Sequence, residues 1–177
     1  MTVLVTGVAG FIGAATARAL LARGDRVVGI DNLNHYYDPQ VKQARLDRLT
    51  SDFGDRFAFE RVDFSDASAL HGFGNGKDFD RIVHLGAQAG VRYSLENPGA
   101  YFQSNLLGHG NMLELARSRG SSHFVYASSS SVYGGNKSLP FRVEDRVDHP
   151  LSLYAASKKS NELVSEAYAN IYRLPST

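Results

Sequence analysis

The sequence has 177 residues, of which 43% are hydrophobic and 21% are charged, which predicts one globular domain with a core of ordinary size. The formal net charge of +1 gives no electrostatic basis for binding nucleic acid or an anionic membrane, and no stretch reaches the roughly 20 apolar residues of a membrane span. The chain has no cysteine, which excludes disulfides, thiolate catalysis and zinc–cysteine sites and agrees with a reducing compartment. Glycines interrupt the apolar N-terminus and no basic segment precedes it, so we expect no signal peptide and a cytoplasmic protein.

Short apolar runs alternate with segments of helical periodicity along the chain. The predicted strands are residues 2–6, 26–31, 56–63, 79–87 and 123–128. The predicted helices are residues 11–24, 38–52, 66–71, 97–120 and 152–173, with Asp38 and Ser152 as N-caps. Apolar strands separated by helices indicate a parallel sheet covered on both faces, and right-handed crossovers favour a doubly wound, Rossmann-type α/β fold of strand order 3-2-1-4-5. Ligands of such folds bind beyond the carboxyl ends of the strands.

The segment "TGVAGFIG" lies between the first predicted strand and the first predicted helix. It places Gly7, Gly10 and Gly13 at the spacing G-x-x-G-x-x-G. Gly7 permits a tight turn, Gly10 lets the backbone approach a pyrophosphate, and Gly13 lets the helix pack closely on the strand. The helix N-terminus attracts phosphates. An ordinary glycine-rich turn is the alternative, but the strand before, the helix after and an acid at the right distance favour a dinucleotide site.

That acid is Asp31, at the end of the second predicted strand and 18 residues beyond Gly13. A carboxylate there accepts hydrogen bonds from the adenosine ribose and repels a 2′-phosphate, which favours NAD over NADP. Asp63 ends the third strand, where it could reach the adenine amino group. Each aspartate could instead be a simple turn or loop cap.

The segment "YAASK" places Tyr154 and Lys158 four residues apart on one face of the last predicted helix. A nearby ammonium favours the phenolate form of a tyrosine, which makes a general base. Lys158 could also hold the nicotinamide ribose, whereas Lys159 lies off that face. A tyrosine and a lysine at this spacing are common by chance. The catalytic role predicted for Tyr154 and Lys158 therefore depends on the dinucleotide motif and on the nearby hydroxyls.

Four serines, Ser128 to Ser131, follow the fifth predicted strand in "VYASSSSVYG". They leave the strand at its carboxyl end, in the same crevice as Tyr154. One serine hydroxyl can hold a sugar oxygen while the tyrosine takes the proton. One sugar oxygen needs one serine, which leaves the others unexplained.

Several segments together resemble the extended short-chain dehydrogenase/reductase superfamily of NAD-dependent nucleotide-sugar epimerases and dehydratases. They are "VTGVAGFIG", "HLGAQAGVRYS", "VYASSSSVYG" and "YAASK". Residues 29–49 and 87–105 narrow the likeness to the UDP-glucuronate 4-epimerases, and it runs over essentially the whole chain. The resemblance implies epimerisation at C4 of a UDP-sugar, UDP-glucuronate to UDP-galacturonate. A hydride passes from C4 to NAD, the 4-keto intermediate rotates, and the hydride returns to its other face.

The resemblance also implies roles for individual residues. Tyr154 is the base, Lys158 is its partner, and Ser129 assists the base. The residues that it assigns to NAD are Gly7, Gly10, Phe11, Ile12, Gly13, Asp31, Asn32, Asp63, Phe64, Leu85, Ala87, Gln88, Ser104, Tyr154 and Lys158.

Recognition of the uronate carboxylate is a further hypothesis. Related enzymes that act on neutral UDP-sugars tend to have Ala-Thr at positions 130 and 131, and the dehydratases have Asp-Glu. Ser130 and Ser131 could donate charge-assisted hydrogen bonds to a C6 carboxylate, with Ser129 also at the substrate. They could instead be polar filler after the strand. Arg92 is a rival partner for the carboxylate, or a member of a surface salt bridge.

The remaining expectations concern assembly and alternatives. Family members exceed 300 residues, so we expect residues 1–177 to be the NAD-binding domain with the catalytic helix, without the C-terminal substrate domain. The fifth strand would then be a sheet edge or pair elsewhere. Helices 97–120 and 152–173 resemble the pair through which the family dimerises. A non-catalytic NAD-binding module or inactive fragment is the main alternative. A dehydratase or reductase is disfavoured by the missing Asp-Glu pair.

Other residues carry weaker expectations. The six histidines show no metal-ligand spacing, so we expect no metal site and assign His84 to strand packing. Tyr36 and Tyr37 could line the sugar cleft or be surface aromatics.

Overall fold

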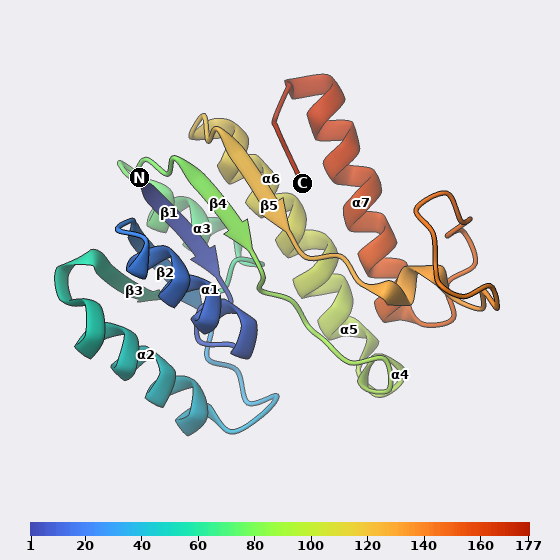
Figure 1. The fold of residues 1–177 in the computed structure, drawn as a ribbon, viewed down its shortest axis with the longest axis horizontal. Coiled ribbons are helices and arrows are strands. Elements are labelled where there is room, and N and C mark those ends of the chain that lie inside the picture. The colour runs from blue at the N-terminus through green and yellow to red at the C-terminus, as the bar shows by residue number, and fades with distance from the viewer.

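A computed structural model describes all residues from 1 to 177. Its centre is a parallel five-stranded sheet of order β3-β2-β1-β4-β5 (Figure 1), which confirms the predicted topology. The strands are β1 (Thr2–Thr6), β2 (Arg26–Asp31), β3 (Phe57–Arg61), β4 (Arg81–His84) and β5 (His123–Tyr126). The main helices are α1 (Phe11–Ala22), α2 (Pro39–Phe53), α3 (Ala67–Gly74), α6 (His109–Ser118) and α7 (Leu153–Tyr172). Two single-turn helices, α4 (Tyr93–Glu96) and α5 (Pro98–Tyr101), precede a π-helix at Phe102–Gly108.

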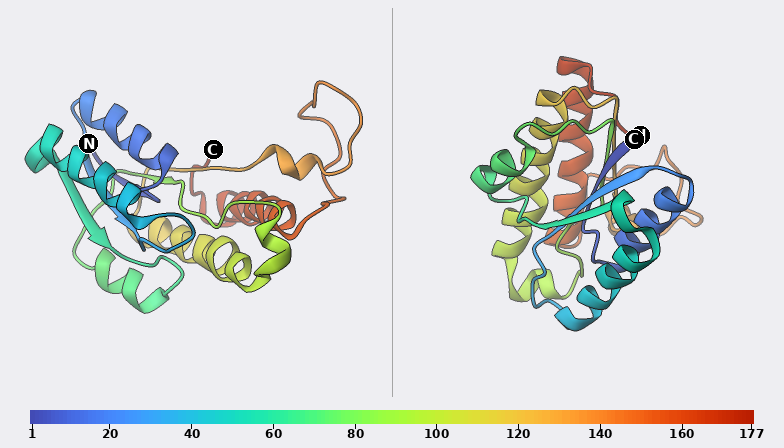
Figure 2. Two further views of the ribbon diagram at one scale, coloured as in Figure 1. Left: turned by 90° about the horizontal axis from the view of Figure 1, so that it is seen from below. Right: turned by 90° about the vertical axis from the view of Figure 1, so that its left-hand side faces the viewer.

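Helices cover both faces of the sheet (Figure 2), because successive strand residues point to opposite sides. In β1, Val3 and Val5 belong to a core cluster shared with α1 and α2. Leu4 points the other way, into a cluster shared with α3, α6 and Phe124 of β5. The strands are therefore buried on both faces, which is why they are nearly continuous apolar runs.

The predicted helix starts are confirmed by their caps. Asp38 accepts a hydrogen bond from the backbone N–H of Gln40 at 2.9 Å, with Pro39 in the first turn. Ser152 accepts one from the N–H of Ala155 at 3.0 Å, at the start of α7. These bonds satisfy N–H groups that have no partner within their helices. None of the helices is long and apolar enough to cross a membrane.

The long helix predicted over residues 97–120 is confirmed, because the chain is helical without a break from Pro98 to Ser118, although its middle section is a π-helix. The π-helix separates α5 from α6 and contains Asn105, whose side-chain oxygen accepts the backbone N–H of Gln88 at 2.8 Å. Its amide nitrogen donates to the carbonyl of Gln88 at 3.0 Å and to Ser157 at 3.0 Å. These contacts join the π-helix to α7 and to the segment after β4.

The strands β3, β4 and β5 end earlier than predicted. The N–H of Gly86 donates to the side-chain oxygen of Thr6 at 2.9 Å rather than to a neighbouring strand. Residues 85–90 therefore leave the sheet and form part of the crevice at its carboxyl edge.

The outer edge of β5 pairs with the C-terminal residues, which was one of the two expected outcomes. The N–H of Phe124 donates to the carbonyl of Pro175 at 2.8 Å, and Thr177 exchanges hydrogen bonds with Phe124 and Tyr126 at 3.0 Å each. Figure 1 shows this last segment returning from α7 to lie along β5. The side chain of Leu174 is 5% exposed and anchors the segment in the core.

Candidate functional site

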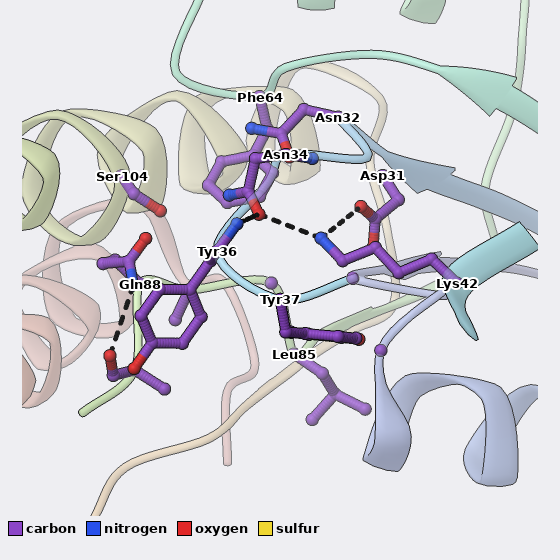
Figure 3. Close-up of a pocket in the computed structure, with 15 residues that line it drawn as sticks. Asp31, Asn32, Asn34, Tyr36, Tyr37, Lys42, Phe64, Leu85, Gln88 and Ser104 are labelled. Atoms are coloured by element: carbon purple, nitrogen blue, oxygen red, sulfur yellow. Dashed lines mark hydrogen bonds and ion pairs between the residues drawn. The ribbon is translucent and has the colours of Figure 1, made fainter. Parts of the chain in front are cut away.

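A pocket of about 160 Å³ lies at the carboxyl ends of β1, β2 and β4 (Figure 3). Its lining contains nine of the residues predicted to bind the cofactor: Gly7, Gly10, Asp31, Asn32, Phe64, Leu85, Ala87, Gln88 and Ser104. Six further residues complete it: Asn34, Tyr36, Tyr37, Lys42, Gly86 and Ala89. A pocket at this edge of a parallel sheet is the usual place for a ligand.

The glycine-rich turn forms one wall of the pocket and leaves no room for larger side chains. Gly7 has φ +65°, and a Cβ atom there would lie 2.8 Å from Cα of Gly86. A Cβ atom on Gly13 would lie 2.0 Å from the carbonyl oxygen of Gly7. Helix α1 can therefore start directly against the turn, with Phe11 and Ile12 exposed at its N-terminus. The arrangement fits a pyrophosphate, because backbone N–H groups and the helix N-terminus face the same space.

Asp31 ends β2, whereas Asp63 lies two residues beyond the end of β3, and the two carboxylates have different surroundings. The carboxylate of Asp31 is buried and accepts the N–H of Leu33 at 2.8 Å. Asp63 lies outside the main pocket and accepts bonds from the N–H and hydroxyl of Ser65, at 2.9 and 2.6 Å, and from Asn32 at 3.0 Å. Burial opposes ionisation of Asp63, but the hydrogen bonds from Ser65 and Asn32 outweigh it and lower its pKa. Asp63 is thus a turn cap that also holds Asn32 at the pocket.

Lys42 is a pocket residue that the sequence analysis did not identify. It comes from α2, and its ammonium lies 3.8 Å from the carboxylate of Asp31 and 2.9 Å from the side-chain oxygen of Asn34. In α2, Lys42 occupies the same buried stripe as Leu46 and Leu49. A lysine at an apolar position of an amphipathic helix was the signal that could have revealed it.

Both tyrosines of the loop after β2 line the pocket, so neither is a surface aromatic alone. The ring of Tyr37 lies 4.8 Å from the ammonium of Lys42. Tyr36 reaches across toward the segment after β4, where its hydroxyl approaches Gly90 (Figure 3).

The tyrosine and lysine of "YAASK" lie in the first turns of α7, which is packed beside the π-helix and the short 3-10 helix at Ser130–Tyr133. The ring of Tyr154 meets that of Tyr101 edge-on, with centroids 6.1 Å apart. The ammonium of Lys158 donates to the carbonyl of Ala127, just after β5, at 2.8 Å. Neither residue lines the pocket of Figure 3; both lie farther along the same edge of the sheet.

Lys158 is 6% exposed, and burial lowers its pKa to about 8. The neighbouring His84 and His109 are also buried, and burial, with the charge of Lys158 as a further cause, lowers the pKa of each. His84 hydrogen-bonds Thr6 at 2.7 Å and packs edge-on against Phe64. The predicted packing role of His84 is confirmed. Lys159 pairs with Glu162 at 3.1 Å, off the face of Lys158 as predicted.

Three of the four serines make side-chain hydrogen bonds. Ser128 donates to Glu162 of α7 at 2.6 Å. The hydroxyl of Ser129 caps the 3-10 helix by accepting the N–H of Ser131 at 3.2 Å and donates to the Ser131 hydroxyl at 3.1 Å. Two of the serines thus fix the turn after β5 and its contact with α7. Arg92 is exposed and forms no salt bridge, so the surface-salt-bridge alternative is wrong.

Comparison with curated proteins places the chain among nucleotide-sugar enzymes. It is 46% identical over 177 residues to a probable UDP-glucuronate 4-epimerase of Rhizobium meliloti (strain 1021), covering 100% of this chain and 51% of the relative. It is 47% identical over 178 residues to UDP-glucuronate 4-epimerase 1 of Arabidopsis thaliana, covering 100% of this chain and 41% of the relative. The chain spans about half the length, or less, of these relatives.

Solved structures agree with this placement. A UDP-glucuronic acid 4-epimerase of Bacillus cereus, in complex with UDP-glucuronic acid and NAD, superposes with a TM-score of 0.86 at 32% identity, over 100% of this chain and 55% of the other. A dTDP-glucose 4,6-dehydratase of Streptomyces venezuelae, with NAD bound, gives a TM-score of 0.87 at 32% identity, over 99% of this chain and 54% of the other. A family model described as GDP-mannose 4,6 dehydratase matches residues 4–177. The chain therefore belongs to the NAD-dependent epimerase/dehydratase family that this model describes.

Proposed function

We propose that this chain is the NAD-binding and catalytic part of a nucleotide-sugar 4-epimerase that interconverts UDP-glucuronate and UDP-galacturonate. One observation carries the proposal. A pocket built on the glycine turn and Asp31 lies on the same sheet edge as a buried lysine fixed at the end of β5, one helical turn from Tyr154. The relatives named as UDP-glucuronate 4-epimerases support the choice of sugar.

The residues of the pocket fit NAD. Cβ atoms on Gly7 and Gly13 would clash with the backbone of Gly86 and of Gly7, so the turn and the start of α1 pack tightly at the pocket wall. Gly7 and Gly10 line the pocket with backbone alone, which suits a close approach to a pyrophosphate. Asp31 accepts one bond through a single carboxylate oxygen, which leaves the other for a ribose hydroxyl. The exposed N-terminus of α1 at Phe11 and Ile12 would hold the cofactor's phosphates. When bound, NAD supplies the acceptor and later the donor of the C4 hydride.

Tyr154 removes the proton of the sugar C4 hydroxyl while hydride leaves the same carbon, which produces a C4 ketone. The ammonium of Lys158 stabilises the tyrosine anion, and the hydroxyl of Ser129 holds the sugar oxygen. Return of the proton from Tyr154 and of hydride to the other face of C4 gives the epimer. Lys158 is fixed for this role because its hydrogen bond to Ala127 ties α7 to the end of β5.

The first experiment is turnover. The protein is mixed with UDP-glucuronate, and formation of UDP-galacturonate is followed by NMR. Tyr154→Phe should abolish conversion, whereas Tyr172→Phe, an exposed tyrosine of the same helix, should leave it intact. Bound NAD without conversion would favour the non-catalytic module. A product lighter than the substrate by the mass of one water would favour a dehydratase. Equal activity of the Tyr154→Phe variant would contradict the assigned chemistry.

We assign recognition of the uronate to Ser130 and Ser131, with Arg92 as the rival partner of the carboxylate. Ser130 makes no side-chain hydrogen bond within the chain, and Arg92 makes no salt bridge, so both are available to a carboxylate. Replacing Ser130 and Ser131 with alanine should weaken the binding of UDP-glucuronate about 10-fold or more, because charge-assisted hydrogen bonds are lost. The binding of UDP-glucose should be weakened much less, because it has no carboxylate. Arg92→Gln tests the rival partner in the same assay. Equal losses for both sugars would contradict a carboxylate-binding role.

A homodimer through the segment 97–120 and α7 belongs to the same proposal. Large apolar side chains are exposed on both elements, with Phe102 and Leu107 on the first and Leu163 and Ile171 on the second. Leu163→Glu should shift the mass measured by light scattering from dimer to monomer. Cell fractionation tests the cytoplasmic location that the sequence predicts.

A further inference from the structure

Lys42 is a buried cation in the cofactor pocket that the proposed chemistry does not use. It is 4% exposed, although lysine is rarely buried without a partner. Figure 3 shows its side chain extending from α2 into the pocket, with the ammonium directed at Asp31 and Asn34. A buried charge in a ligand pocket calls for a physical reason.

Three groups hold the ammonium in place. The carboxylate of Asp31 lies at 3.8 Å, the side-chain oxygen of Asn34 accepts at 2.9 Å, and the ring of Tyr37 lies 4.8 Å away. An ammonium has three N–H donors, and only the one to Asn34 forms a hydrogen bond within the chain. Lys42 therefore keeps donor capacity toward the pocket.

Lys42 and Asp31 form a charge-compensated pair, with side chains 6% and 7% exposed. The pair presents a carboxylate and an ammonium to the same part of the pocket. A ribose 2′-hydroxyl can donate to the carboxylate and accept from the ammonium. A ribose 2′-phosphate would be repelled by Asp31 and attracted by Lys42. Discrimination between NAD and NADP therefore depends on which of these two charges has the larger effect on the phosphate.

We propose that Lys42 is a specificity-determining residue for the adenosine end of the cofactor: it orients Asp31 toward a 2′-hydroxyl, and it becomes the binding group for a 2′-phosphate once the charge of Asp31 is removed. The inference rests on the proposed NAD-binding function. It implies that the Asp31 carboxylate excludes NADP from a site that already contains the required cation.

The test is equilibrium binding of NAD⁺ and NADP⁺ by isothermal titration calorimetry to the full chain and four variants. Asp31→Asn retains the shape of the side chain and an acceptor for the N–H of Leu33. This variant should bind NAD⁺ about 10-fold more weakly, because a charge-assisted hydrogen bond is lost, and NADP⁺ about 10-fold or more tightly, because one is gained. The double variant Asp31→Asn/Lys42→Met should lose the gain in NADP⁺ binding, and Asp31→Asn/Lys42→Arg should retain it. Asp31→Asn/Lys137→Met, which changes an exposed lysine of a distant loop, is the matched control.

The outcomes separate the two proposals. Failure of the unaltered chain to bind NAD⁺ overturns the proposed function and this inference with it. Binding of NAD⁺ together with NADP⁺ affinity that does not depend on Lys42 overturns the inference alone. That second result would point to Arg45, which hydrogen-bonds the Tyr37 hydroxyl at 2.9 Å, as the phosphate partner. Thermal unfolding of each variant confirms that it is folded before titration.

Discussion

Replacing Lys158 with methionine should stabilise the fold at neutral pH while it removes activity. Burial lowers the pKa of Lys158 from 10.5 to about 8, which corresponds to about 3 kcal/mol of folding free energy. At pH 7 the folded chain must hold the ammonium in a site that disfavours it, whereas the unfolded chain hydrates it. Methionine has a similar length and no charge, but it loses the hydrogen bond to Ala127, which contributes about 1 kcal/mol. The net expectation at pH 7 is a gain of about 2 kcal/mol.

The stability difference between the Lys158→Met variant and the unaltered chain should change with pH. Between pH 8 and 10.5 the unfolded chain binds more protons at Lys158 than the folded chain does, so the stability of the unaltered protein rises with pH relative to the variant. Above pH 10.5 the penalty is absent, and the variant should be about 1 kcal/mol less stable because of the lost hydrogen bond. Its advantage must therefore shrink and reverse as the pH rises.

Urea denaturation followed by circular dichroism at pH 7 and pH 10.5 measures both values. Lys159→Met is the matched control, because Lys159 is partly exposed and paired with Glu162 on the surface; its effect should stay within about 0.5 kcal/mol. Turnover by the unaltered protein should also fall above about pH 8, where the ammonium is lost. A stability difference between Lys158→Met and the unaltered chain that is the same at both pH values would refute the reasoning.

Two further predictions concern packing. Gly13→Ala should destabilise the fold by about 3 kcal/mol, because its Cβ atom would lie 2.0 Å from the Gly7 carbonyl oxygen. Gly110→Ala, at a helix position with open space around it, should instead stabilise the fold by about 0.5–1 kcal/mol. Similar denaturation midpoints for the two variants would contradict this. Tyr101→Phe should cost about 1–3 kcal/mol, because the Tyr101 hydroxyl shares its one proton between the carbonyls of Ala89 and Gly90, at 2.8 and 2.5 Å. Tyr172→Phe should have no effect in the same denaturation experiment, and equal losses for the two variants would indicate that the buried hydrogen bonding contributes nothing.

The strand order and most of the pocket could be predicted because their signals are local. Apolar runs, the N-caps Asp38 and Ser152, and the glycine spacing each depend on neighbouring residues, and the topology then follows from the handedness of crossovers. The π-helix could not be predicted, because it depends on Asn105 bonding Gln88 and Ser157, which are distant in sequence. The same holds for the pairing of Thr177 with β5.

The two buried lysines, Lys158 at the catalytic helix and Lys42 at the cofactor pocket, show why one functional residue was predicted and the other was missed. Lys158 lies in a known motif, so the resemblance identified it. Lys42 belongs to no motif, yet both share one physical signature, a cation on the buried stripe of an amphipathic helix. Such a position costs folding free energy unless a partner offsets it, and a surface lysine would serve the helix equally well. Lys42 is compensated by Asp31 at 3.8 Å and Lys158 by a single carbonyl at 2.8 Å, which explains why burial lowers the pKa of Lys158. A lysine on the buried stripe of a helix is therefore evidence for a site in its own right: Lys42 lies at the cofactor pocket beside Asp31, and Lys158 lies at the end of β5 beside Ala127.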